Sequence, residues 1–120
     1  MTYAISVANY EIAQLNECCL IEMPAQFTLT EAKGFEHQFE NICQVVSSTT
    51  RKIILDFGKT TFIDNNGLIC LCQLFRAAKK AGIDLLFWSL SAEIEIIFSL
   101  TGLDKVFAIA ANTEAITKPL

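Results

Sequence analysis

The sequence lacks what several large classes of protein require. No run of apolar residues approaches the roughly 20 that a membrane-spanning helix needs, and no basic, apolar leader opens the chain. The net charge is −4 and no stripe of lysine and arginine is present, so the chain has little with which to neutralise a phosphate backbone. A single histidine, His37, leaves no Ser-His-Asp or Cys-His set to propose. We therefore expect a cytoplasmic protein with no membrane insertion and no nucleic-acid partner.

The five cysteines form no obvious chelate or disulfide framework. Cys18 and Cys19 are adjacent on an expected strand and so point to opposite faces. Cys70 and Cys72 lie two apart on an expected helix and do not face the same way. An odd count, completed by Cys43, favours reduced thiols buried in the core. A metal or nucleophilic role is the weaker alternative, so no metal site and no cofactor are expected.

What the sequence does have is enough apolar material for a real core. Hydrophobic residues make up 52% of its 120 residues, which predicts one domain spanning residues 1–120. Residues 9–17 are expected to connect the first two strands, and residues 58–65 to form a loop. The expected strands are 3–7, 18–23, 51–57, 84–90 and 106–110. The expected helices are 28–46, 67–81, a short one capped by Ser91, and a terminal one capped by Asn112 or Thr113. The helix 67–81 is expected to bury an apolar stripe formed by Leu68, Leu71, Cys72, Phe75 and Ala78.

The alternation of these elements predicts the fold class. Thr28 and Glu31 have the spacing of a capping box at the start of the first helix. The apolar run from Ile53 to Leu55 is typical of a strand buried on both faces. Strands separated by single helices are expected to pair in parallel through right-handed crossovers. The prediction is an α/β fold with a mixed sheet of four or five strands, a parallel centre and crossover helices.

Two motifs carry a resemblance to a known family. Residues Ile53 to Leu68 read Ile-Ile-Leu-Asp-Phe-Gly-Lys-Thr-Thr-Phe-Ile-Asp-Asn-Asn-Gly-Leu, a hydrophobic strand ending in Asp and followed by a loop that opens a helix. Leu100-Thr101-Gly102-Leu103 follows at the correct spacing. This order resembles the STAS domain family, in particular its anti-sigma-factor antagonists (anti-anti-sigma factors). The resemblance covers more than half of the chain.

The resemblance implies a protein-interaction module with no enzymatic activity. In such antagonists the second hydroxyl residue of an Asp-Ser-Ser-Gly or Asp-Ser-Thr-Gly motif is phosphorylated by a partner kinase that is also an anti-sigma factor. The implied partner is an anti-sigma factor or a histidine-kinase-like serine kinase, and a homodimer is a further option. One alternative is a STAS subunit of a transport or stress-signalling assembly. Another alternative is a small nucleotide-binding or hydrolytic protein. It is the weaker one, because no phosphate-binding loop is present.

The sequence departs from the family motif at its decisive positions. Asn66 occupies the phosphoacceptor position and Asn65 precedes it, and neither can accept a phosphoryl group. The family's Gly-Glu-Leu-Asp is replaced by Ala25-Gln26-Phe27-Thr28, which removes an expected acidic residue. The fold expectation is unaffected, but phosphorylation at the usual position is not expected.

The candidate site is therefore the loop from residue 60 to residue 67 and the start of the helix after it. As an alternative, residues 64–67 serve only as a turn and helix start. Asn66 is expected to cap the second helix, with its side-chain oxygen accepting from a first-turn amide. Thr60 and Thr61 are either substitute phosphorylation sites or hydrogen-bond donors that hold the loop. Asn66-Gly67 is also a deamidation-prone pair. The predicted partner-binding residues are Thr60, Thr61, Phe62, Asp64, Asn65, Asn66, Gly67 and Leu68.

Overall fold

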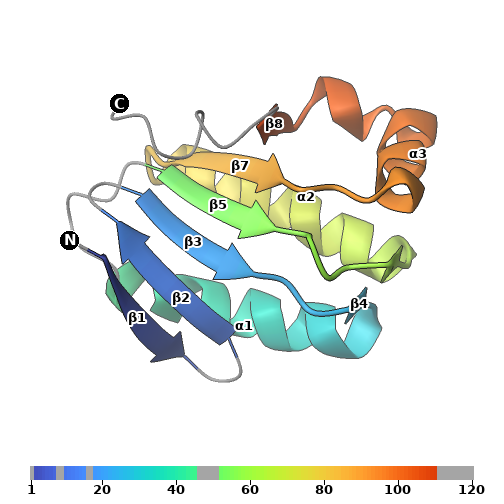
Figure 1. The fold of residues 1–120 in the computed structure, drawn as a ribbon. Coiled ribbons are helices and arrows are strands. Elements are labelled where there is room, and N and C mark those ends of the chain that lie inside the picture. Colours follow the sequence, from blue (N-terminus) through green and yellow to red (C-terminus); the bar gives the residue numbers. More distant parts are fainter. Residues whose placement is uncertain (1, 8–9, 16–17, 46–51, 111–120) are drawn as a thin grey trace.

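A sheet of six strands forms the centre of the computed structural model (Figure 1). The structure describes residues 2–7, 10–15, 18–45 and 52–110. The strand order is β1-β2-β3-β5-β7-β8. The strands are β1 (Thr2–Val7), β2 (Tyr10–Leu15), β3 (Cys18–Glu22), β5 (Lys52–Asp56), β7 (Asp84–Trp88) and β8 (Ala108–Ala110).

The sheet is mixed, with its parallel part at the centre and at one edge. β1, β2 and β3 pair antiparallel, whereas β3, β5, β7 and β8 pair in parallel. The predicted α/β class with a parallel centre is confirmed. The main sheet has six strands instead of the expected four or five, because the stretch 9–17 contains β2, which pairs with both β1 and β3. Its alternation of Tyr10 and Ile12 with polar and small residues is a strand signal that the glutamates and asparagines around it obscured.

Three α-helices connect the parallel strands. They are α1 (Leu29–Val45), α2 (Asn65–Lys80) and α3 (Ala92–Thr101), followed by the short 3-10 helix η1 (Leu103–Lys105). Figure 1 shows α1 and α2 side by side behind the sheet, with α3 beyond the ends of β5 and β7. Two helices on one face follow from right-handed crossovers between successive parallel neighbours. The predicted terminal helix lies outside the described residues.

Local signals end and begin these helices where the sequence indicates. The Thr28 hydroxyl donates to Glu31 Oε2 at 2.6 Å, and the Glu31 carboxylate also accepts from the Thr28 backbone amide, which is the half of the expected capping box that Glu31 supplies. The Ser91 hydroxyl accepts from the Ile94 amide at 3.3 Å at the start of α3. Gly82 and Gly102 both adopt positive φ, of 75° and 78°, where α2 and α3 end.

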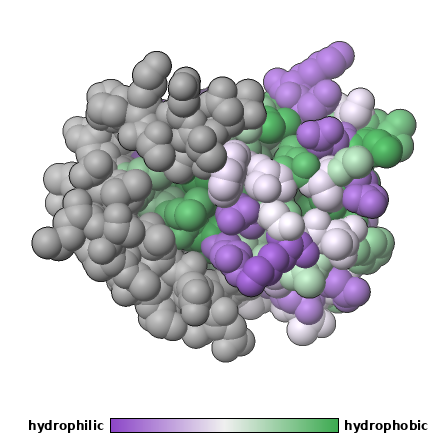
Figure 2. Space-filling model, in the orientation of Figure 1, coloured by the Kyte–Doolittle hydropathy of each residue, from purple (hydrophilic) through white to green (hydrophobic). Residues whose placement is uncertain are grey.

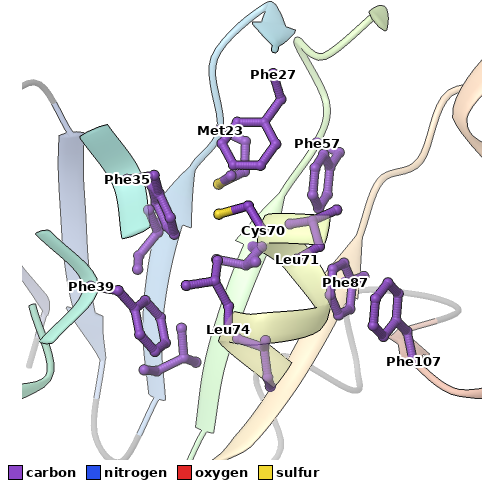
Figure 3. Packing of buried hydrophobic residues seen from close by; sticks show 14 of the residues in the cluster. Met23, Phe27, Phe35, Phe39, Phe57, Cys70, Leu71, Leu74, Phe87 and Phe107 are labelled. Carbon is purple, nitrogen blue, oxygen red and sulfur yellow. The ribbon is translucent and has the colours of Figure 1, made fainter. Parts of the chain in front are cut away.

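The core lies between β3, β5, β7 and the two helices behind them (Figure 3). Ile53, Ile54 and Leu55 of β5 have no exposed surface, as predicted for a strand buried on both faces. Aromatic rings fill the space toward α3, and Phe87 stacks on Phe107 with ring centroids 4.3 Å apart. Together with the flanking strands, this packing fixes the ends of β3 and β5, from which the loops of the candidate site emerge.

A second, two-stranded sheet continues the chain beyond those ends. β4 (Gln26–Phe27) pairs in parallel with β6 (Phe62–Ile63). Three residues connect β3 to β4, and five connect β5 to β6. The predicted loop 58–65 thus contains a strand, although too short a one to show a periodic pattern.

Candidate functional site

The small sheet brings the N-termini of α1 and α2 together. Gln26 pairs with Phe62, and Phe27 pairs with Ile63. The residue after β4 is Thr28, which precedes α1, and the residue after β6 is Asp64, which precedes α2. Both helices therefore begin at one edge of the molecule, and their partly positive ends point the same way. This edge carries the whole of the predicted partner-binding loop.

Asp64, and not Asn66, caps α2. The Asp64 backbone is extended and its Oδ1 accepts from the Gly67 amide at 2.8 Å. Its carbonyl oxygen accepts from the Leu68 amide at 3.0 Å. The predicted cap was wrong because α2 begins at Asn65, two residues before the expected start at Gly67. Asp is as good a capping residue as Asn, and here its position three residues before Gly67 decides which of them caps.

Asn65 and Asn66 are consequently the first two residues of the helix, and both are exposed. Residue 66 is presented to solvent at a helix N-terminus. At such a place a negative charge would be stabilised by the helix but would alter any docked surface. The asparagine amide supplies neither the charge nor a hydroxyl to carry it.

Gly67 allows α2 to approach the small sheet closely. A Cβ atom at this position would overlap the Phe27 carbonyl oxygen and lie 2.8 Å from Ile63 Cγ2. Gly67 is buried, as is Ile63, whereas Phe62 is 49% exposed. Of these two neighbours in β6, Ile63 faces the core and Phe62 faces solvent.

The two threonines of the loop differ in exposure. Thr60 is buried and its hydroxyl donates to the Pro24 carbonyl oxygen at 2.7 Å. Thr61 is exposed, and its amide donates to the Ala25 carbonyl oxygen at 2.9 Å. The hydrogen bonds expected of them are present, but they reach a segment 36 residues away in sequence. They tie the loop to the chain between β3 and β4.

Sequence reasoning missed two apolar side chains beside the loop. Leu29 at the start of α1 is 44% exposed, and Ile69 in α2 is 49% exposed. Ile69 lies three and four residues after Asn66 and Asn65, so the three share one face of the helix. The signal was available, because Ile69 stands outside the predicted apolar stripe Leu68, Leu71, Cys72, Phe75 and Ala78. The edge thus carries three exposed apolar side chains, those of Phe62, Ile69 and Leu29, in addition to the two exposed asparagines.

That stripe was itself only partly right. The buried residues of α2 are Gly67, Cys70, Leu71, Leu74 and Ala78, while Leu68, Cys72 and Phe75 are partly buried. Because α2 packs against α1 as well as against the sheet, its buried face includes Cys70. The Cys70 Sγ lies 3.5 Å from the Ala32 carbonyl oxygen of α1. Burial raises the pKa of the Cys70 thiol to about 12. A thiol in this state is a packing group, and Cys18 and Cys19 are buried as well, as predicted. Cys72 is only half-buried, which corrects the prediction for that residue, and the side chain of Cys43 lies outside the described part of the chain.

The charged groups of the edge are held by local partners. The hydrogen bond from Thr28 lowers the pKa of the partly buried Glu31 carboxyl, against a smaller opposing effect of Asp64. Lys59 forms an ion pair with Glu22 at 2.7 Å, and Asp56 Oδ1 accepts from the Gly58 amide at 2.8 Å. Among the described residues, no three His, Cys, Asp or Glu side chains gather as a metal-binding group. None of the described helices has both the length and the apolar character to span a membrane.

A protein-family model described as the STAS domain matches residues 9–116. The chain belongs to the STAS domain family. The resemblance carried by the motif at Ile53 to Leu68 is therefore confirmed at the level of the family. The motif spans β5, β6 and the first turn of α2, and it ends at the residues that form the edge described above.

Solved structures share the STAS fold at low sequence identity. A protein from Thermotoga maritima has a TM-score of 0.75 and 20% identity, over 90% of this chain and 92% of that one. The Bacillus cell fate determinant SpoIIAA in its phosphorylated form has a TM-score of 0.62 and 17% identity, over 97% and 96%. A sulfate transporter family protein from Wolinella succinogenes has a TM-score of 0.68 and 17% identity, over 83% and 82%. These likenesses confirm the fold.

Proposed function

We propose that this STAS domain is a non-enzymatic interaction module that binds a regulatory kinase or anti-sigma factor through the edge formed by residues 60–68. SpoIIAA, with which it shares its fold, is an anti-sigma factor antagonist, and SpoIIAA exists in phosphorylated and unphosphorylated forms. A partner of this kind would place the protein in the cytoplasm. With Asn66 at the phosphoacceptor position, the chain would act as a permanently unphosphorylated antagonist.

The observation that carries the proposal is the exposed apolar and amide surface at the paired helix N-termini. Phe62 and Ile69 are each half exposed, although both stand beside buried residues, and Asn65 and Asn66 lie between them in sequence. Apolar anchors surrounded by neutral hydrogen-bonding groups are typical of interface centres, where charges are depleted. The same surface becomes unfavourable to a docked partner once a charge is placed at its centre.

The test is binding of each histidine-kinase-like serine kinase of the source organism to purified wild type, Asn66→Ser and Asn66→Asp. We expect Asn66→Asp to bind at least about tenfold more weakly, since a desolvated charge in an interface costs on the order of 1.4 kcal/mol or more. Asn66→Ser should bind like wild type until the kinase and ATP are combined, and should then be released. Thermal melts should show Asn66→Asp folded and no less stable than wild type, because the charge lies at a helix N-terminus.

A matched control places the same charge elsewhere. Ser99 is exposed on α3, and Ser99→Asp adds one negative charge away from the edge. We expect Ser99→Asp to retain binding. If Asn66→Asp binds every kinase that the wild type binds with unchanged affinity, residues 60–68 are not the interface.

A second candidate function, as a STAS subunit of a transport or stress-signalling assembly, is favoured by a second apolar surface. Four apolar side chains of α3 and the segment after it are exposed, Leu100 by 82%. Two of them, Ile96 and Ile109, line a groove of about 470 Å³ together with Leu90. Figure 2 shows apolar side chains on this side of the molecule, at the place that α3 occupies in Figure 1. The four side chains are Ile96, Leu100, Val106 and Ile109.

The variant Leu100→Glu tests this second candidate function. If the variant no longer assembles into a large native complex but still binds the kinase, the result would favour this candidate.

A further inference from the structure

The pair Asn66-Gly67 combines a reactive sequence with a local structure that opposes its reaction. Asparagine followed by glycine deamidates when the glycine nitrogen attacks the asparagine Cγ. A C–N bond forms, the bond from Cγ to the amide nitrogen breaks, and ammonia leaves with the proton of the attacking nitrogen. Water then opens the resulting succinimide ring to aspartate or isoaspartate. No oxidant and no enzyme is needed, and the product carries one more negative charge.

The attacking atom in this chain is occupied. The Gly67 amide is the group that donates to Asp64 Oδ1 at 2.8 Å. It is therefore held toward the capping carboxylate, and ring closure would require that hydrogen bond to break. The backbone at Asn66 is also helical, and it must rotate out of this conformation before Gly67 can reach Cγ.

The space around Gly67 opposes the same rotation. The Cα of Gly67 faces the Phe27 carbonyl oxygen and Ile63 Cγ2 so closely that no Cβ would fit between them. Turning the peptide between Asn66 and Gly67 would push this backbone against β4. Both obstacles disappear only when the first turn of α2 separates from the small sheet.

We propose that Asn66 is a deamidation site which the Asp64 cap and the contact with β4 hold closed, so that opening of the α2 N-terminus controls when a negative charge appears at residue 66. The protection itself does not depend on any partner. Its consequence for binding rests on the proposed function, because the new charge would lie where an antagonist of this family carries its phosphate. Deamidation would then place a negative charge at residue 66 slowly and irreversibly, whereas a kinase cannot do so because Asn66 has no hydroxyl.

The experiment measures conversion of Asn66 by peptide mapping and mass spectrometry, with full-length protein kept in mildly alkaline buffer. Wild type should convert much more slowly when native than in denaturant, where nothing holds the Gly67 nitrogen. Asp64→Ala removes the cap and should accelerate native conversion by about fivefold, since that is the factor by which loss of a typical cap shifts a local opening equilibrium. Asp64→Ser keeps a capping oxygen and should convert at nearly the wild-type rate.

The matched control loosens the other end of the same helix. Gly82→Ala places a side chain at a φ of 75° beyond the end of α2 and leaves Asp64 in place. It should convert like wild type. Equal acceleration in Gly82→Ala and Asp64→Ala would show that general instability, and not the cap, sets the rate.

Two further outcomes would overturn the proposal. The first is native wild type that converts as fast as denatured wild type. The second is slower conversion in Asp64→Ala, which would make the carboxylate a base that assists the attack. Hydrogen exchange in wild type tests the protection of the Gly67 nitrogen without a variant. The Gly67 amide should exchange slowly. Kinase binding of the deamidated protein is measured separately, so failure of the partner proposal leaves the chemical result intact.

Discussion

The hydroxyl of Thr60 stabilises the fold. It is buried, and it donates to the Pro24 carbonyl oxygen at 2.7 Å. Thr60→Val keeps the shape and removes the donor, leaving a carbonyl oxygen with one partner fewer. We expect a loss of about 1–3 kcal/mol in the free energy of unfolding, measured by urea denaturation.

Thr61→Val is the matched control one residue further along. The Thr61 hydroxyl is exposed and its distance to the Ala25 carbonyl oxygen is 3.4 Å, so its loss should change stability by less than about 0.5 kcal/mol. Equal losses in the two variants would contradict the assignment of Thr60 as the tie between the loops. The burial of Thr60 also leaves Thr61 as the accessible hydroxyl of the two for a kinase.

Cys70 is expected to respond to pH in a characteristic way. Burial raises the pKa of its thiol to about 12, against an ordinary value of 9.0. Near pH 8 its reactive thiolate is then populated at about 1 part in 10⁴, and alkylation of native protein should be slow there. The half-buried Cys72 should react faster under the same conditions.

The same shift has a consequence for stability. Below pH 9 the thiol is neutral in both the folded and the unfolded chain, so it contributes no pH dependence. Between pH 9 and pH 12 the unfolded chain releases the proton and the folded chain keeps it, so the stability that this contributes is lost as pH rises. Cys70→Ala should flatten that decline. An unchanged slope would place the titration elsewhere.

At the scale of elements, the approach of α2 to the small sheet is tested by two glycines in different surroundings. Gly67→Ala has no room for its Cβ beside the Phe27 carbonyl oxygen, and the helix must move away. We expect a loss of about 1–3 kcal/mol. In contrast, a Cβ at Gly34 in α1 meets nothing within 4 Å, and Gly34→Ala should gain about 0.5–1 kcal/mol from helix propensity.

Thermal denaturation of both variants gives the measurement. Similar effects of the two substitutions would mean that the contact at Gly67 relaxes easily and that α2 is not fixed against β4.

The elements themselves were predictable where a local signal was strong. The capping box at Thr28, the cap at Ser91 and the buried run in β5 were found from sequence because each depends on residues within a few positions of one another. β4 and β6 were missed because their pairing joins segments 36 residues apart and spans two residues each. The exposed pair Leu29 and Ile69 became a common surface only through that pairing.

Choice of the α2 cap failed for a different reason. Asp64, Asn65 and Asn66 are all good capping residues, and propensity alone does not separate them. The close packing of Gly67 against β4 fixes where the helix begins, and this is a tertiary contact. The family motif indicated where the loop ends and α2 begins to within two residues, but not the hydrogen bonds there.

At the scale of the whole molecule, stability should fall from the middle of the sheet toward its edge at β8. β5 lies between β3 and β7, and its central residues have no exposed surface. β8 has three residues, pairs on one side with β7, and exposes Ala108 and Ile109. We expect amides of β5 to exchange with solvent only through global unfolding, and those of β8 through local opening.

Native hydrogen exchange followed by mass spectrometry measures this gradient. Protection of β8 equal to that of β5 would show that the segment is covered in solution by another surface, which would support the assembly candidate.

The unequal connectors to the small sheet also limit how the length of this chain can change. The turn at Gly58 and Lys59 takes up the two extra residues between β5 and β6. Because side chains alternate along a strand, losing one residue there would move Ile63 to the exposed place of Phe62 and bring Asp64 to the buried place of Ile63. Losing two would restore the alternation. Insertions and deletions tolerated in this turn should therefore contain an even number of residues. Only such changes keep the alternation between β5 and the second half of the family motif.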